Sequence, residues 1–385
     1  MKNLLLLICS SLFVLPAMAQ NSFSIDHGPY LQEVTTSGAT FVFNTSHPSI
    51  SNIELRKEGS SSVTVCYQSQ HGLKRANESF YAIRAEDLEG ATTYQYRICA
   101  KQMKSFEPYK VVFGDSIVSQ WYTFRTIDLK QKEGNIFVTS DIHSKPQLLR
   151  KLLEECDYKT CTSFFYAGDM MNYMKRDGEH PFTSFIDTSV ELFASSVPFE
   201  LVRGNHETRG DMARIFPSFF PKRDGKIYGS YLMGNVMVIM LDSGEDKAES
   251  HPVYAGLTDF EAYRIEQAKW LEQLVKSKEY KKAKYRIVIS HFPLVMSEVW
   301  QKENSWHGWA DACRKFLPIL NKADIDLVVS GHTHRFFYHE IDEAGNRFPI
   351  LEQGHKCGTR LEYTDQSMKV KVVDETGKVL LERTL

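Results

Sequence analysis

The sequence predicts an α/β fold that is preceded by a small all-β sandwich domain. The first part of the chain contains short aromatic and β-branched runs separated by turn residues, which is typical of antiparallel strands. From about residue 135 onward, apolar runs alternate with helical stretches, which is typical of α/β proteins. A chain of 385 residues is also too long for one typical hydrophobic core, so we expect two domains.

Residues 1–19 have the features of a secretory signal peptide. Lys2 is followed by an apolar run from Leu4 to Pro16 and then by the small-residue cleavage motif Ala17-Met18-Ala19. An uncleaved anchor is the alternative, but the apolar run is too short to span a bilayer. We therefore expect a secreted or periplasmic protein without stable membrane insertion.

Residues 20–127 are expected to form the β-sandwich domain. Its clearest strands are "GATFVFNT" (38–45), "TYQYRICA" (93–100) and "WYTFRT" (121–126). In the second of these, Tyr94, Tyr96 and Ile98 alternate with polar residues, as in a half-buried strand. A small β-sandwich is the natural architecture for such strands, and no cluster of catalytic residue types occurs among them.

Residues 128–385 are expected to form the α/β domain, which begins with the polar linker "IDLKQKEG". Helical patterns occupy residues 145–155 and 259–277, and residues 368–385 resemble a hairpin that closes the sheet. The strand runs are apolar on both faces, which suggests strands covered by helices on both sides. These runs are 135–140, 163–168, 199–204, 236–241, 286–290 and 326–331.

Charge and cysteine content narrow the function classes. A net charge of −2 gives no indication of a nucleic-acid-binding surface. The absence of a Cys-x-x-Cys motif argues against a thiolate zinc site. Cys66 with Cys99, and Cys156 with Cys161, are candidate disulfide pairs for an exported protein, although spacing does not determine connectivity.

Polar side chains follow five of the predicted strands, at the point where each strand ends. Because ligands bind at the carboxyl ends of α/β strands, we expect these side chains to converge. Each is an ordinary polar loop residue when taken alone, whereas five such strand ends together indicate a metal site. The candidate ligands are Asp141, His143, Asp169, Asn205, His291, His332 and His334.

The residue types in this set indicate the chemistry. Carboxylate, amide and imidazole groups together suit borderline divalent metals. They are too many for one tetrahedral ion, whereas two ions that share Asp169 as a bridge would use them all. Two ions roughly 3.5–4 Å apart lower the pKa of a bound water to about 7 and clamp the oxygens of an in-line displacement. This chemistry fits hydrolysis of phosphate esters by attack of a metal-bound hydroxide.

The ordered motifs D-x-H, GD, GNH, H and GH-x-H resemble those of the calcineurin-like metallophosphoesterase superfamily. This resemblance covers about Asn135 to His339. The front region, with "GPYLQEVTTSGATFVFNT" and "YTFRT", resembles the fibronectin-III-like N-terminal domain of purple acid phosphatases. The resemblance implies a sandwich of sheets flanked by helices and a binuclear metal centre.

The resemblance also implies a role for each motif residue. One metal would be held by Asp141, His143, Asp169 and His334, and the other by Asp169, Asn205, His291 and His332. His206 would be the general acid or the phosphate-binding group, since an imidazole can protonate a leaving alkoxide near neutral pH. The alternative for His206 is a supporting role beside its ligand neighbour. Glu207 is expected to orient it.

Two departures from the purple acid phosphatase pattern occur together. Asn172 stands where those enzymes have the tyrosine that binds ferric iron, and His143 stands where they lack a histidine. Imidazole thus replaces tyrosinate, so we expect two divalent ions (Mn, Fe or Zn) and no strong visible absorption band in the iron-loaded protein. "VRGNHETRG" also resembles the Ser/Thr protein phosphatases, but "GDMMNYMK" lacks their Asp-Arg-Gly continuation, so a dedicated protein phosphatase is not expected.

Several neighbouring residues have two interpretations each. His307 and the tryptophans around it either line the substrate pocket or pack in the interior. Asp242 follows a strand and either supports a histidine or is a turn residue. Histidines outside the motifs, His355 among them, are expected to be surface or structural residues. Arginines that either bind phosphate oxygens or form salt bridges are Arg203, Arg209 and Arg335.

Together these features favour a secreted phosphomonoesterase with a two-metal site and a small phosphoester substrate. A phosphodiesterase on the same site is the alternative, because the ligands do not separate the two activities. A non-enzymatic binding protein on this scaffold would have lost ligands, and the sequence retains the whole set. No nucleic-acid partner is expected.

Overall fold

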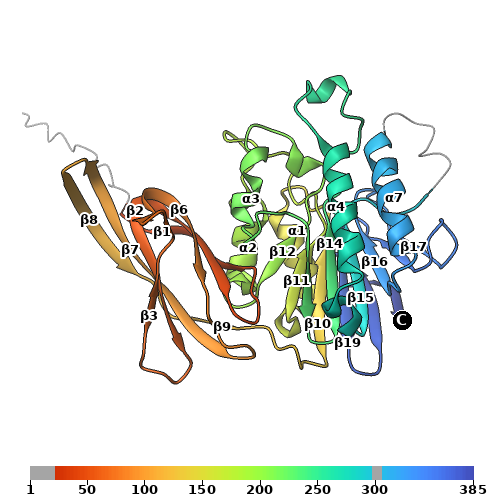
Figure 1. The fold of residues 1–385 in the computed structure, drawn as a ribbon, viewed down its shortest axis with the longest axis horizontal. Coiled ribbons are helices and arrows are strands. Elements are labelled where there is room, and N and C mark those ends of the chain that lie inside the picture. The colour runs from red at the N-terminus through yellow and green to blue at the C-terminus, as the bar shows by residue number, and fades with distance from the viewer. Residues whose placement is uncertain (1–21, 297–305) are drawn as a thin grey trace, which may run out of the picture.

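The structure is a computed structural model that describes residues 22–296 and 306–385. The predicted signal peptide lies outside the described residues. An all-β region is followed by an α/β region, and Figure 1 shows them side by side. The predicted fold class, an α/β sandwich of sheets with a β-rich region in front, is confirmed. The division into domains at residues 127 and 128 stays a prediction.

The N-terminal β region is built around one long strand, β2 (Ala39–Lys57). The other strands are β1 (Ile25–Gln32), β3 (Thr64–Cys66), β4 (Ser69–Gln70), β5 (Leu73–Lys74), β6 (Ala76–Ala85), β7 (Thr93–Glu107), β8 (Lys110–Val118) and β9 (Tyr122–Arg125). The first half of β2 pairs with β1 and β6, and its second half pairs with β3 and β7. Register shifts between Asn44 and Ile50 separate the halves.

The two halves of β2 belong to layers that pack face to face. The ring centroid of Phe41, on the first half, lies 4.4 Å from that of Tyr96 on β7 and 5.5 Å from that of Phe124 on β9. Buried aromatic and β-branched side chains alternate along these strands, because successive residues of a strand face opposite sides. The packing is that of a sandwich, as the alternating sequence pattern predicted.

The first sheet of the α/β region contains β10 (Gly134–Thr139), β11 (Ser163–Tyr166), β12 (Phe199–Leu201), β19 (Cys357–Tyr363), β20 (Met368–Asp374) and β21 (Val379–Thr384). Their order across the sheet is β12-β11-β10-β19-β20-β21. β10, β11 and β12 are parallel. β20 and β21 form the predicted C-terminal hairpin at one edge.

The second sheet contains β13 (Gly229–Met233), β14 (Val236–Leu241), β15 (Tyr285–Ser290), β16 (Leu327–Ser330), β17 (Phe337–His339) and β18 (Ile350–Glu352). Their order is β13-β14-β15-β16-β18-β17. β14, β15, β16 and β18 are parallel, and both edge strands are antiparallel to their neighbours.

Each sheet is covered by helices on one face and by the other sheet on its other face. The inner faces share one core, in which Ile136 and Val138 of the first sheet lie with Val238, Ile287 and Val329 of the second. The expectation of helices on both sides of each strand is therefore wrong, since the second apolar face meets a sheet. The α-helices of the described residues are α1 (Pro146–Glu155), α2 (Asp187–Ser189), α3 (Phe216–Phe219), α4 (Phe260–Leu274), α5 (Lys278–Lys282) and α7 (His307–Leu320).

Buried polar contacts join the β region to the α/β region. The Tyr30 hydroxyl donates to the carbonyl of Phe219 at 2.8 Å, and Gln32 Nε2 donates to the carbonyl of Phe199 at 2.6 Å. Phe199 opens β12, so the β region supports a strand that leads to the site. Among the described residues, no helix combines the length and apolar character needed to cross a membrane.

The cysteines of the described residues are free thiols, so the two candidate disulfides are not formed. Cys66 is in register with Ile53 and Cys99 is in register with Asn52, and the two therefore flank β2 on opposite sides. In the other candidate pair, the Sγ of Cys161 lies 3.9 Å from the carbonyl oxygen of Asp157.

Candidate metal centre

The candidate ligands lie at the carboxyl ends of strands from both sheets. The first sheet supplies Asp141 and His143 after β10, Asp169 after β11 and Asn205 after β12, and the second supplies His291 after β15 with His332 and His334 after β16. The sandwich therefore brings all these residues to one edge, which is where ligands bind in open α/β sheets.

The backbone at these strand ends adopts left-handed conformations that residues with a Cβ rarely take. Positive φ values occur at Asp141 (54°), His143 (49°), Asp169 (52°), His332 (73°) and His334 (59°). Such strain persists only where the surrounding structure holds it, and it clusters at functional sites. Five of the seven candidate ligands therefore share this conformation, whereas Asn205, with φ of −69°, does not.

Two glycines allow the carboxylates to approach the neighbouring loops. A Cβ on Gly204 would lie 2.1 Å from Asp169 Oδ1, and a Cβ on Gly331 would lie 2.4 Å from Asp141 Oδ2. Both distances are far below van der Waals contact, so only glycine fits at either position. The "GN" and "GH" pairs of the motifs thus reflect close packing against an acidic residue.

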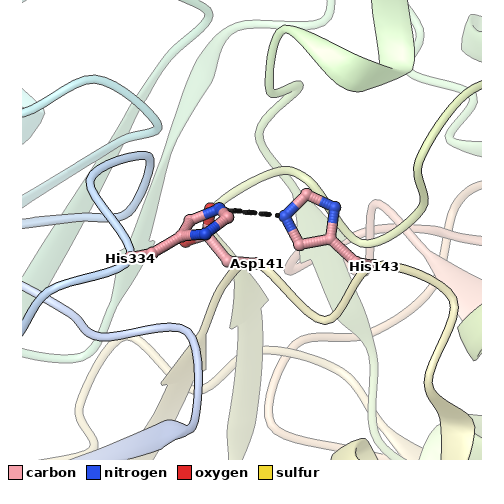
Figure 2. Close-up of side chains that lie close together, drawn as sticks. All are labelled: Asp141, His143 and His334. Carbon is pink, nitrogen blue, oxygen red and sulfur yellow. Dashed lines mark hydrogen bonds and ion pairs between the residues drawn. The ribbon is translucent and has the colours of Figure 1, made fainter.

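Asp141, His143 and His334 form a first group, the outer triad. His334 Nε2 lies 3.0 Å from His143 Nε2 and 3.3 Å from Asp141 Oδ1. Figure 2 shows the two imidazoles turned toward each other beside the carboxylate. The Asp141 side chain is fully buried, whereas that of His334 is 47% exposed. The outer triad is therefore open to solvent on one side.

Asp169, His291 and His332 form a second group, the inner triad. His291 Nε2 lies 3.1 Å from Asp169 Oδ2, and these two side chains are 0% and 2% exposed, respectively. Asn205 joins the group, because its Oδ1 lies 3.2 Å from His291 Nε2 and 3.1 Å from His332 Nδ1. In each triad the potential ligand atoms lie within 4.8 Å of one another.

Backbone hydrogen bonds connect the two triads. The N–H of His332 donates to both carboxylate oxygens of Asp141, at 3.2 and 3.1 Å. The N–H of His143 donates to the carbonyl of Asp169 at 3.1 Å, and the N–H of Asp141 donates to the carbonyl of Gly168 at 3.0 Å. Each triad thus depends on the backbone of the other, and the two form one site.

Burial and mutual charge shift the pKa values of the inner triad. Burial lowers the pKa of His332 to about 3, and the charge on His291 acts in the same direction. Burial also disfavours charge on His291, but the Asp169 carboxylate more than offsets this and raises the pKa of His291 to about 10. The same interaction holds the pKa of Asp169 below its ordinary value despite burial. His332 is therefore neutral at pH 7, the state in which an imidazole binds a metal.

These residues fit divalent cations. Among the described residues, neither Asp141 nor Asp169 pairs with a lysine or arginine, so two buried carboxylates lack a permanent cationic partner. The Nε2 atoms of His143 and His334 face each other at 3.0 Å, a distance at which only one of them can carry a proton. Convergent oxygen and imidazole ligands without a lysine or arginine partner suit a borderline divalent cation.

His206 lies between the triads. Its backbone N–H donates to Asp169 Oδ1 at 2.9 Å, and its ring Nε2 lies 3.8 Å from Asp169 Oδ2. Its ring centroid lies 5.0 Å from that of His143, edge to face, and its Nδ1 lies 2.5 Å from the carbonyl oxygen of Asn172. The side chain is 29% exposed, so a ligand that enters the site from solvent can reach it.

Glu207 does not orient His206, contrary to the expectation from the sequence. Its buried carboxylate accepts the backbone N–H groups of Gly204 at 2.8 Å, Asp169 at 2.9 Å and Met170 at 2.7 Å. It therefore holds together the loops that follow β11 and β12. Burial and the nearby Asp169 charge raise the pKa of Glu207 above its ordinary value.

Two supporting residues escaped the sequence analysis. The Glu179 carboxylate accepts hydrogen bonds from Asn172 and Ser144, which lie in the loops that carry Asp169 and His143. His355 Nδ1 lies 3.0 Å from the carbonyl oxygen of His334. No motif surrounds either residue: Glu179 lies 7 residues from Asn172 and 35 from Ser144, and His355 lies 21 residues from His334.

The tryptophans near His307 pack in the interior, and His307 itself pairs with a carboxylate. Both Trp306 and Trp309 lie against the ring of His332, with centroids 5.4 and 5.2 Å away. His307 Nε2 lies 3.0 Å from Glu261 Oε1. Tyr173, which follows Asn172, is 44% exposed, so it does not replace the tyrosine that Asn172 substitutes.

Two of the three arginines are committed to carboxylates. Arg203 donates to Asp242 Oδ2 at 2.7 Å, and Arg209 donates to Glu245 Oε2 at 2.9 Å. Asp242 therefore supports an arginine rather than a histidine. Both arginines line a cleft of about 1020 Å³ beside the loop that carries Asn205. Arg335 is exposed.

Curated relatives are similar to this chain over about half of its length. The chain is 24% identical over 221 residues to the mouse (Mus musculus) serine/threonine-protein phosphatase CPPED1, covering 57% of this chain and 66% of that protein. It is 23% identical over 214 residues to the human (Homo sapiens) protein of the same name, covering 54% and 63%. The chain thus spans less than two thirds of the length of these relatives.

Two solved structures share the fold over most of the chain. A purple acid phosphatase, PPD1, from yellow lupin (Lupinus luteus) seeds matches with a TM-score of 0.66 at 14% identity, covering 92% of this chain and 73% of that one. PhoD matches with a TM-score of 0.61 at 10% identity, covering 92% and 91%. At these identities the matches show the fold alone.

The family model described as calcineurin-like phosphoesterase matches residues 134–336, which include every candidate ligand. The resemblance inferred from the motifs is therefore confirmed, and divalent metal ions are implied by the fold of this family. The chain belongs to the calcineurin-like phosphoesterase family.

Proposed function

We propose that this protein is a phosphomonoesterase with two divalent metal ions. The observation that carries the proposal is the convergence of two carboxylate–imidazole triads on one edge of the sandwich, with Asp169 in contact with residues of both. The outer triad would hold one ion and the inner triad with Asn205 the other, with Asp169 shared. Ions bound there would acidify a water and neutralise charge on the phosphoryl oxygens.

The residues of the chain itself would position the substrate and move a proton. His206 Nε2 faces the space beside Asp169 and lies next to His143. From there it would protonate the leaving oxygen as the ester bond breaks. Such proton transfer is the contribution of a general acid to catalysis. The hydrogen bond from His206 N–H to Asp169 holds the backbone in place during this step.

A phosphodiesterase on the same residues is the second candidate activity, because nothing in the two triads distinguishes a monoester from a diester. A phosphoprotein substrate is a third, which the name of the curated relatives favours. Manganese, iron and zinc all suit the ligand set. We also propose that residues 1–19 direct export and are removed, so that N-terminal sequencing of the protein recovered from the native host should begin at Gln20.

The test is hydrolysis by the mature protein loaded in turn with Mn, Zn and Fe. An aryl phosphate monoester, the matching diester and a phosphoserine peptide are compared at equal concentration. Faster turnover of the monoester supports the proposal, and a diester or peptide preference replaces it with the corresponding alternative. No turnover of any ester by any metal form, with both metals bound, would overturn a phosphoester hydrolase function.

A further inference from the structure

The Glu179 carboxylate gathers donors from two loops of the site. It accepts the backbone N–H of Asn172 at 2.8 Å and the Nδ2 of the same residue at 2.7 Å. It also accepts the hydroxyl of Ser144. Ser144 directly follows His143 of the outer triad, and Asn172 lies three residues after Asp169. One carboxylate therefore ties together the loops that follow β10 and β11.

Asn172, which Glu179 holds, is also in contact with the His206 ring. Its carbonyl oxygen lies 2.5 Å from His206 Nδ1. Because a carbonyl can only accept, the proton of the neutral ring lies on Nδ1. Nε2, which lies 3.8 Å from Asp169 Oδ2, is then the ring nitrogen nearest that carboxylate. Ring orientation and tautomer are both set by a residue that Glu179 holds at two points.

Glu179 is suited to hold donors because it remains ionised. Partial burial favours its neutral form, but the hydrogen bonds from Ser144 and Asn172 outweigh this and lower its pKa below the ordinary value. Hydrogen bonds to a carboxylate are roughly twice as strong as those between neutral groups. The contact is therefore a firm anchor for the Asn172 carbonyl.

We propose that Glu179 is a positioning residue that acts through Asn172 to aim His206 at the leaving oxygen. In this step the Nε2–H bond of His206 breaks, and the leaving oxygen takes the proton together with the electron pair of the broken P–O bond. Water supplies the new oxygen on phosphorus and releases one proton to solvent. The inference rests on the proposed function, because it requires His206 to be the proton donor.

Glu179→Gln tests the proposal, because an amide of the same shape cannot accept all three donors. The rates of the variant and the wild type are compared over phosphate monoesters from acidic aryl to basic alkyl leaving groups. A general acid matters most for basic leaving groups, so we expect a roughly tenfold or larger loss for alkyl esters and about twofold or less for p-nitrophenyl phosphate. Metal content by mass spectrometry should equal that of the wild type.

Asp177→Asn is the matched control, since it removes an exposed charge two residues away. It should behave as the wild type, and Glu179→Asp should recover part of the lost activity toward alkyl esters. An equal loss for all leaving groups, or a loss of bound metal, would overturn the positioning role. If the wild type itself hydrolyses none of these esters, the proposed function fails instead, and the two failures remain distinguishable.

Discussion

The two triads contain the same residue types in different surroundings. In the inner triad, the Asp169 and His291 side chains are almost fully buried and form an ion pair at 3.1 Å. In the outer triad, the Asp141 carboxylate is equally buried, but His334 is 47% exposed. The same carboxylate–imidazole combination therefore forms one site tied to the protein core and one site open to solvent and ligands.

This difference in burial predicts that substitutions in the two triads have different effects on the stability of the fold. Breaking a buried ion pair by removing one partner is costly even without a metal, because the remaining charge is left buried and uncompensated. A half-exposed imidazole contributes little to folding, so its main effect is on ligand binding. Substitutions in the inner triad should therefore change stability and metal binding together, whereas substitution of the half-exposed His334 in the outer triad should change metal binding alone.

Asp169→Ala is expected to have the largest effect on activity, because Asp169 would be a ligand of both metal ions. The substitution removes the partner of His291 Nε2 and of the His206 N–H. We expect kcat/KM to fall roughly 10³-fold or more, which corresponds to about 4 kcal/mol. Metal content by mass spectrometry should fall at both triads. Retention of both ions by the variant would contradict a bridging role for Asp169.

His291→Ala and His334→Ala compare the triads directly. His291→Ala leaves the Asp169 charge buried and unpaired, so we expect the free energy of unfolding of the metal-free protein to fall by about 3 kcal/mol or more. His334→Ala should lower it by about 0.5 kcal/mol or less, because the side chain is half exposed. Urea unfolding of the metal-free variants measures both values. Equal losses would show that depth does not separate the triads.

The strand ends, and the convergence of the candidate ligands on them, could be predicted because they are encoded locally. Each ligand segment follows an apolar run, and the change from apolar to polar residues marks where the strand ends. The arrangement of strands in two sheets could not be read in this way. An apolar face looks the same in sequence whether a helix or a second sheet covers it, as for Val138 in the first sheet and Val238 in the second.

The residues that support the candidate ligands could not be assigned from the local sequence. Glu207 adjoins His206 in sequence, which suggested a direct contact, but its carboxylate turns to the backbone of Gly204 and Asp169. Glu179 and His355 contact the site across sequence separations that carry no motif. The sequence thus indicated the candidate ligands but not the residues that support them, because those contacts form between loops that neighbouring strands of one sheet bring together.

Gly204→Ala and Gly331→Ala probe the carboxylates one at a time. The new Cβ would lie 2.1 Å from Asp169 Oδ1 in the first variant and 2.4 Å from Asp141 Oδ2 in the second. Displacing a catalytic group by about 1 Å costs roughly 100-fold in rate, and overpacking costs about 1–3 kcal/mol of stability. We expect activity losses in both variants, measured as kcat/KM, with the larger loss of stability in Gly204→Ala.

Gly178→Ala is the matched control for these two variants. Its nearest contact would be the Cβ of Lys175 at 3.6 Å, an ordinary van der Waals distance. Activity and stability should therefore stay close to those of the wild type. If Gly331→Ala were as active as this control, the tight approach of Asp141 to the loop after β16 would have no role in the outer triad.

His355→Ala is expected to have the smallest effect and to act on the outer triad alone. His355 Nδ1 donates to the carbonyl of His334 at 3.0 Å, and the two ring centroids lie 5.3 Å apart. Residues that orient a ligand typically affect metal affinity by 10- to 100-fold, and contact through a carbonyl places this one near the lower limit, at roughly tenfold. Metal titration of the metal-free protein, followed by calorimetry, should show weaker binding at one of two sites.

The exposed His71→Ala, in the N-terminal β region, serves as the control for a lost surface imidazole and should bind both ions as the wild type does. If His355→Ala weakened both sites equally, the backbone links from His332 to Asp141 and from His143 to Asp169 would couple the triads strongly. If it weakened one site only, those links would position the triads without transmitting strain between them. The burial of each triad, rather than the backbone hydrogen bonds between the triads, would then control the affinity of each metal site.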